Sequence, residues 1–197
     1  MAGHFEPLAG GGAAVALDEV EISILRSLAV QLLELIGPGE ADGPDAADPL
    51  ARLFAEGPSE PPADPALARL FPDAYGTPGA EQDRQERAHA AEFRRYTEND
   101  LRARKREDAL GVVRSLDGLT VAGDGVAVLR LDPEGCRQWL GALNDLRLTI
   151  GARLEITDED DGEAFYRLPD EDPRKPMVMA YLWLGGLQET LVEALTA

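Results

Sequence analysis

The segment from Trp139 to Leu154 carries an apolar residue at every third or fourth position. The stripe consists of Trp139, Leu143, Leu146, Ile150 and Leu154. This spacing describes one face of an α-helix, whereas a half-buried strand alternates at every second residue. The chain must therefore pack at least one long amphipathic helix against a core.

Other segments combine the same periodicity with helix start and stop signals. Asp18 is placed as an N-cap for a helix that Gly37-Pro38-Gly39 ends. Asp132-Pro133 places a cap and a first-turn proline before the Trp139 segment. We expect helices over residues 19–36, about 80–117, 133–154 and from Pro176 to the C-terminal end.

Strand signals are few. Residues 13–17 are typical of a short strand, and residues 119–131 predict a hairpin. Its strands would be LTV and VAVLRL, joined by the turn Ala122-Gly123-Asp124-Gly125. The expected fold is mainly α with a small antiparallel β element (α+β). About four long helices would pack around one hairpin, which the N-terminal strand could join.

Proline and glycine divide the chain into segments. The Gly-rich residues 1–12 predict a flexible N-terminus, and residues 13–197 a single helical domain. A Pro/Gly-rich insertion occupies about 37–79. Within it DPLARLF at 48–54 is followed by DPALARLF at 64–71. Each copy predicts either a short helical clip that docks on the domain or a repeated partner-binding motif.

Charge and cysteine content restrict the function. The formal net charge of the 197-residue chain is −18, which repels a phosphate backbone and favours a basic protein partner. Direct DNA binding is therefore not expected. The one cysteine excludes an intrachain disulfide and a Cys-rich metal site. The start of the chain resembles no signal peptide, and no apolar stretch reaches membrane-spanning length, so we expect a cytoplasmic protein.

Catalytic motifs are absent from the sequence. It contains no Gly-x-Ser-x-Gly and no phosphate-binding loop, and His4 and His89 have no second ligand at metal-binding spacing. The acidic run at 158–163 does not match a calcium loop and predicts a solvated loop. We therefore expect no metal, no cofactor and no enzymatic activity.

One cluster of basic residues interrupts the acidity of the chain. It lies on the predicted helix at 80–117 and consists of Arg94, Arg95, Arg102, Arg104, Lys105 and Arg106. Acidic residues are interspersed among them, which favours a solvated face with ion pairs between successive turns. The alternative is a contact face for an acidic protein or for DNA.

The sequence allows two interpretations for each of two further candidate sites. Cys136 is a redox candidate because a helix N-terminus lowers a thiol pKa, although its apolar neighbours favour an inert buried side chain. Asn144, Asp145 and Arg147 set polar groups into the apolar helix. They predict either a structural hydrogen-bond network or a partner or ligand site, the latter beside Tyr166, Tyr181 or Trp183.

Several stretches together resemble a known family. They are ALARLFPDAY, EFRRYTENDLRARK, WLGALNDLRLTIGARL and YLWLGGLQETLVEAL. They are similar to the actinobacterial AosR-like oxidative-stress regulators, a family long described only as a domain of unknown function. The resemblance covers residues 13–196.

The resemblance implies a regulator of transcription in the oxidative-stress response. Such a protein would act by contact with a sigma factor or RNA polymerase and not by catalysis, and a homo-oligomer is compatible with it. Redox control in that family implies a Cys-x-x-x-Cys disulfide. This chain departs from that pattern, because Asp132 and Leu140 stand four residues either side of Cys136.

Overall fold

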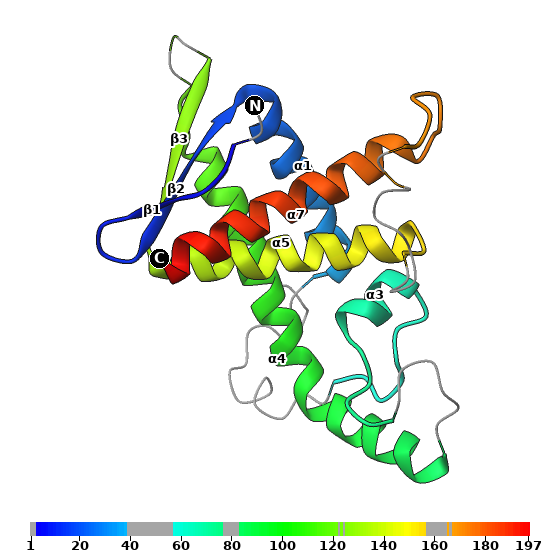
Figure 1. The fold of residues 1–197 in the computed structure, drawn as a ribbon. Coiled ribbons are helices and arrows are strands. Elements are labelled where there is room, and N and C mark those ends of the chain that lie inside the picture. Colours follow the sequence, from blue (N-terminus) through cyan, green and yellow to red (C-terminus); the bar gives the residue numbers. More distant parts are fainter. Residues whose placement is uncertain are drawn as a thin grey trace.

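The computed structural model describes residues 3–38, 57–76, 83–121, 123, 125–156, 165 and 167–197. Its elements are β1 (Glu6–Leu8), β2 (Gly12–Asp18), α1 (Glu19–Ile36), α3 (Pro65–Leu70), α4 (Arg84–Asp117), β3 (Val126–Leu131), α5 (Pro133–Arg153) and α7 (Lys175–Thr196) (Figure 1). This arrangement confirms the predicted fold class, mainly helical with a small antiparallel sheet.

Aspartate caps set the starts of most helices. Asp18 forms a capping box with Glu21 at the start of α1, and Asp132 accepts a hydrogen bond from the Gly135 N–H at the start of α5. Asp83 caps α4, which begins at Arg84, so the long helix starts later than the expected residue 80. Each cap satisfies N–H groups that have no partner inside the helix.

The predicted hairpin at 119–131 is wrong, because β3 pairs with β2 and not with residues 119–121. The two strands run antiparallel in the register Ala13↔Leu131, Val15↔Leu129 and Leu17↔Ala127. All of these side chains are buried on one face of the sheet. The seven-residue β2 can match the alternation of β3 over its whole length, whereas the LTV segment offers three residues.

The N-terminal segment also differs from the expected flexible tail, because β1 pairs with β2 as the edge of a three-stranded sheet. Gly10 and Gly11 have φ values of 103° and 90°, which the connecting turn requires. The Phe5 ring packs edge-on against Trp139, with 5.9 Å between centroids. The glycines that predict mobility therefore build a hairpin turn.

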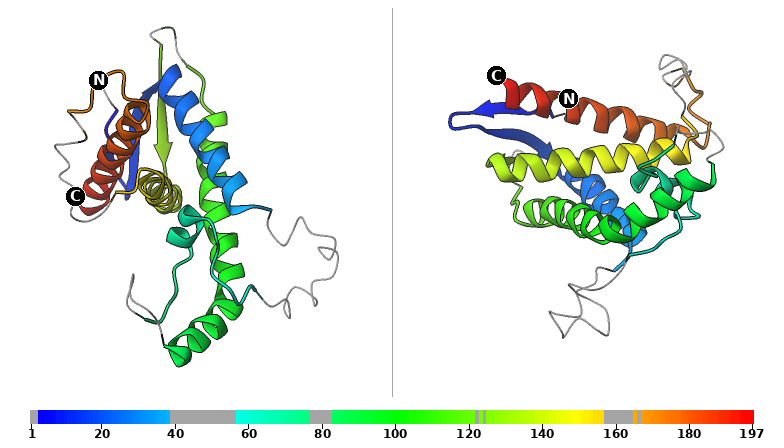
Figure 2. Two further views of the ribbon diagram at one scale, coloured as in Figure 1. Left: turned by 90° about the vertical axis from the view of Figure 1, so that its right-hand side faces the viewer. Right: turned by 90° about the horizontal axis from the view of Figure 1, so that it is seen from below.

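Helix α5 is the centre of the fold. Seen along its axis, it lies between α7 on one side and α1 and α4 on the other (Figure 2). Its buried residues include Trp139, Leu143 and Leu146, in agreement with the stripe in the sequence. The N-terminal half of α4 extends beyond this body, and the segment carrying α3 runs beside it (Figure 1).

The insertion is partly described. The second Leu-Phe phrase forms α3, capped by Asp64, and buries Ala66, Leu70 and Phe71. This confirms a short helix with Pro65 in its first turn. The first phrase at 48–54 and the acidic run at 158–163 lie outside the described residues.

Candidate functional site

Arg94 lies at the centre of a buried ion cluster. Its side chain is 4% exposed and donates to the Glu98 carboxylate one turn further along α4. Its second terminal nitrogen donates to the Phe71 carbonyl and to the Asp73 carboxylate, both at 2.9 Å. Because Glu98 is 2% exposed, each charge is compensated inside the protein.

Two other basic residues of α4 satisfy the C-terminal end of α1. Arg102 donates to the Ile36 carbonyl at 2.8 Å, and Arg106 donates to the carbonyls of Leu33 and Gly37. The last turn of α1 holds no basic residue of its own. Arginines of α4 therefore supply the donors that the terminal carbonyls of α1 require, at the negative end of its dipole.

The candidate basic contact face on α4 is thus corrected. Arg94, Arg102, Lys105 and Arg106 are directed at partners within the protein, and Arg95 is half-buried beside Tyr96. Arg104 is exposed. Helical spacing shows that these residues lie on one helix, but it does not show that the helix packs against α1, α3 and α5 through them.

Asp145 faces α4. Lys105 Nζ lies 2.6 Å from its Oδ1, and the two side chains are 15% and 3% exposed. Burial raises the pKa of Asp145, and the ion pair with Lys105 opposes that shift. Asp108 lies nearby on α4, where burial raises its pKa to about 6 against the opposing charge of Arg104.

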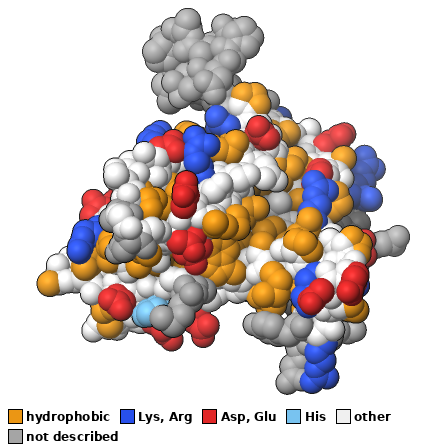
Figure 3. Space-filling model, turned by 90° about the horizontal axis from the view of Figure 1, so that it is seen from above, with side chains coloured by type: hydrophobic (Ala, Val, Ile, Leu, Met, Phe, Trp, Pro, Cys, Tyr) orange, Lys and Arg blue, Asp and Glu red, His pale blue; other side chains and the backbone are white. Residues whose placement is uncertain are grey.

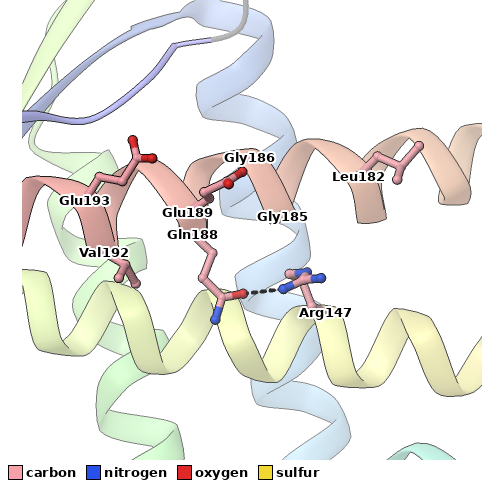
Figure 4. A pocket seen from close by; sticks show the side chains of 8 residues that line it. All are labelled: Arg147, Leu182, Gly185, Gly186, Gln188, Glu189, Val192 and Glu193. Carbon is pink, nitrogen blue, oxygen red and sulfur yellow. Dashed lines mark hydrogen bonds between the residues drawn. The ribbon is translucent and has the colours of Figure 1, made fainter. Parts of the chain in front are cut away.

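Arg147 faces α7 instead. Its guanidinium donates to Gln188 Oε1 at 2.7 Å and lies 5.1 Å from the centre of the Tyr181 ring. Figure 4 shows the hydrogen bond between Arg147 and Gln188 at an open groove along α7. The groove is lined by Arg147, Leu182, Gly185, Gly186, Gln188, Glu189, Val192 and Glu193.

The candidate ligand site is therefore divided between two faces of α5. Asp145 pairs with α4 and also accepts a hydrogen bond from the exposed Asn144, whereas Arg147 pairs with α7. Trp183 is partly buried against the core, and Tyr166 lies outside the described residues. The structure does not bring these groups together as one reaction centre. The sequence did not predict the partners of these side chains, Lys105 for Asp145 and Gln188 for Arg147.

Cys136 is enclosed by the core. It has no exposed surface, and its Sγ lies 4.0 Å from the Leu131 carbonyl. Burial raises the pKa of the thiol, which opposes the lowering expected from its position near the start of α5.

Exposed aromatic residues gather near the free end of α4. The Tyr75 ring lies 6.1 Å from Phe93 and 5.8 Å from His89, measured between ring centres. Phe93 is 47% exposed and Tyr96 is 62% exposed.

On another face, seen from above, hydrophobic side chains gather between charged ones (Figure 3).

The part of the chain that the structure describes holds no group of three or more His, Cys, Asp and Glu side chains placed to bind a metal. Nor does any described helix combine the length and apolar character needed to cross a membrane.

A family model described as "Domain of unknown function (DUF2017)" matches residues 2–195. The chain belongs to the DUF2017 family. Relatives of this DUF2017 protein have names that refer to oxidative stress, in agreement with the resemblance seen in the sequence. The oxidative stress regulator AosR of Mycobacterium tuberculosis is 30% identical over 174 residues, which cover 87% of this chain and 77% of the relative.

Two more relatives of the DUF2017 protein agree with this match. The AosR of Mycobacterium bovis matches to the same extent as the M. tuberculosis protein. A Mycobacterium leprae protein, given the same name provisionally, is 33% identical over 184 residues, which cover 90% of this chain and 79% of the relative. No solved structure is significantly similar to this chain.

Proposed function

We propose that this chain is a non-enzymatic transcriptional regulator of the oxidative-stress response, which acts in the cytoplasm by contact with a sigma factor or RNA polymerase. The observation that carries the proposal is the similarity, over nearly nine-tenths of the chain, to proteins named oxidative stress regulator AosR. The names of these relatives indicate the oxidative-stress response, and contact with the transcription machinery is our inference.

Charge supports a protein partner over DNA. The chain has a formal charge of −18, and most of its local basic cluster is engaged inside the fold by Glu98, Asp145 and the end of α1. Few cations remain on this face of α4 to contact phosphates. A basic surface on a protein partner would complement the acidic exterior.

The exposed aromatic residues near the free end of α4 suit such a contact. Aromatic side chains, Tyr and Phe included, are enriched at the core of protein interfaces, and Tyr is among the residues that carry most of the binding energy. Tyr75, Phe93 and Tyr96 are exposed there, close to the α3 segment. We assign the partner contact to this aromatic patch, defined by these three residues.

Cys136 does not serve as an intrachain redox switch in this proposal. The chain has one cysteine, and its thiol is buried. A signal from peroxide would therefore reach the complex through another component.

Affinity capture of the tagged protein from its native cells, with and without peroxide, tests the proposal. We expect mass spectrometry to identify a sigma factor or RNA polymerase, and Phe93→Ala with Tyr96→Ala to reduce recovery about tenfold or more. Val128→Ala is the matched control, because this exposed apolar residue lies on the sheet. Failure to recover any transcription component under either condition contradicts the proposal.

The alternative is a small-ligand protein that uses Arg147 and the groove along α7. In that case Arg147→Ala would leave the protein folded and abolish ligand binding. A loss of stability without any ligand to lose would identify Arg147 as a structural residue that joins α5 to α7.

A further inference from the structure

Arg147 carries a charge that has no acidic partner within the described part of the chain. Its side chain is partly buried, and Gln188, a neutral acceptor, is its one hydrogen-bond partner among the described residues. Arg94 and Arg153, by contrast, are each paired with a carboxylate. A charge held partly out of water without a counter-ion is unfavourable, so an anion from outside the chain would stabilise this position.

One edge of the Arg147 guanidinium is available to such an anion. Nη1 donates to Gln188, whereas Nε is buried and makes no hydrogen bond to any described residue. Nη2 is also unbonded among the described residues, and it is not buried. Nε and Nη2 together form an edge that can donate to both oxygens of one carboxylate, as in two-pronged arginine–carboxylate pairs.

Two glycines of α7 keep this edge uncovered. A Cβ atom built on Gly185 would lie 3.5 Å from Arg147 Nε and 3.7 Å from Nη2, so a side chain there would cover the edge. A Cβ atom built on Gly186 would meet no atom within 4 Å, so packing does not require a glycine at that position. Glycine inside a helix is less stable than alanine. The two glycines therefore lower helix stability and maintain the open groove seen in Figure 4.

The groove along α7 continues from these glycines to two acidic side chains. Its volume is about 720 Å³, within the range of small-ligand sites. Glu189 and Glu193 line it one helical turn apart, and Val192, which is 42% exposed, adds apolar surface beside them. Glu189 follows Gly185 by one turn, or about 6 Å along the helix axis. The groove therefore presents a cation at one point and carboxylates about one turn further along.

We propose that the groove along α7 binds a small zwitterion, whose carboxylate pairs with Arg147 and whose cationic group pairs with Glu189 or Glu193. The two glutamates would repel an anion that has no cationic group, and a cation alone would leave Arg147 unpaired. Amino acids with a basic side chain carry both charges at this separation, on an aliphatic stem that suits Val192. The inference does not depend on the proposed function, because the aromatic patch lies near the free end of α4.

Amide NMR of the full chain, with L-lysine as the probe, tests the site. We expect saturable shifts at the amides around the groove, with a dissociation constant on the order of 1 mM, the strength expected of so small a ligand. Cadaverine lacks the carboxylate of lysine, and norleucine lacks the side-chain ammonium. Each should bind about tenfold more weakly or less, because each loses a charge-assisted contact.

Gly186→Leu tests the place of binding without a change to Arg147. The new side chain enters open space, so the variant should be at least as stable as the wild type, while it fills the groove and weakens lysine binding about tenfold or more. Arg147→Met should weaken binding to the same extent, although it also removes the hydrogen bond to Gln188. Met179→Leu is the matched control, because this exposed residue of α7 does not line the groove and should leave binding unchanged.

Lysine binding that Gly186→Leu abolishes and Met179→Leu retains supports the site. Equal binding of cadaverine would reduce the groove to an acidic surface, and equal binding of norleucine would remove the role of the glutamates. Lysine that binds Gly186→Leu as tightly as the wild type would occupy another part of the chain, and a lack of saturable shifts would show that the groove does not take this ligand. Each of these other results overturns the proposal.

Discussion

Lys105 of α4 and Asp145 of α5 form an ion pair of 2.6 Å at the interface of their two helices, where neither side chain exceeds 15% exposure. The pair joins the long helix to the central one. A buried charge without its partner is strongly destabilising, because the protein interior does not replace its hydration.

Lys105→Ala is therefore expected to lower the free energy of unfolding by about 3 kcal/mol or more. Replacing both residues, as Lys105→Met with Asp145→Leu, should recover most of that loss, because an apolar pair needs no compensation. Urea unfolding measures both variants. The exposed Arg104→Ala is the control and should change stability by about 0.5 kcal/mol or less. A Lys105 variant as stable as this control would contradict the assignment.

Arg106→Ala should weaken the last turn of α1 more than the rest of the protein. The substitution removes the donor to the Leu33 and Gly37 carbonyls, which no basic residue of that turn can replace. We expect about 1–2 kcal/mol of lost protection at the amides of Ile36 and Gly37 by hydrogen exchange. Amides in α7 serve as an internal reference, and a uniform loss across both helices would indicate global destabilisation instead.

Asp108 should make the protein less stable as the pH rises from about 4 to about 6. Its carboxyl has a pKa of about 6 in the folded chain, raised by burial from the ordinary value of 3.8. Between these values the folded state binds more protons than the unfolded state, so ionisation favours unfolding. Well above pH 6 the Asp108 carboxyl is ionised in both the folded and the unfolded state, so the loss of stability is complete.

Asp108→Asn removes this dependence. The variant should gain stability relative to the wild type over that pH interval, as measured by urea unfolding at pH 4, 5, 6 and 7. Asp145, whose charge also raises the pKa of Asp108, is present in both proteins, so the difference between them reports Asp108 together with its interaction with Asp145. A difference that stays constant from pH 4 to 7 would disprove the shift.

The Cys136 thiol should react with a thiol reagent at least about a hundredfold more slowly in the native protein than in denaturant. The side chain is fully buried, and its raised pKa disfavours the thiolate. Cys136→Ala should cost about 1 kcal/mol, and Cys136→Ser should cost more because it buries a hydroxyl. Rapid labelling of the folded chain would restore Cys136 as a redox candidate.

Helix bounds were predictable because their signals are local. Asp18 and Asp132 cap α1 and α5 as expected, and Pro65 stands in the first turn of α3. Each signal acts on N–H groups within a few residues, so it operates before any tertiary contact forms. The burial of Cys136 was also predictable, since it shares a face with Trp139.

The strand pairing was not predictable in the same way. The segment 119–121 is close to β3 in sequence, whereas β2 is more than a hundred residues away. Pairing is decided by the length of matching alternation and by the side chains that both strands bury. A single segment shows neither the length of the match nor the shared buried side chains, because both depend on a second segment that is distant in the sequence.

The sequence by itself determined where α1 and α5 begin, which helix faces are apolar, and which family the chain resembles. Only the tertiary structure decided what the polar residues of those helices do. Arg94, Arg102 and Lys105 share a basic face when α4 is considered alone, yet they bind Glu98, Ile36 and Asp145. Periodicity reports which side chains share a face of one helix, while the partner of a charge depends on the helix packed against that face.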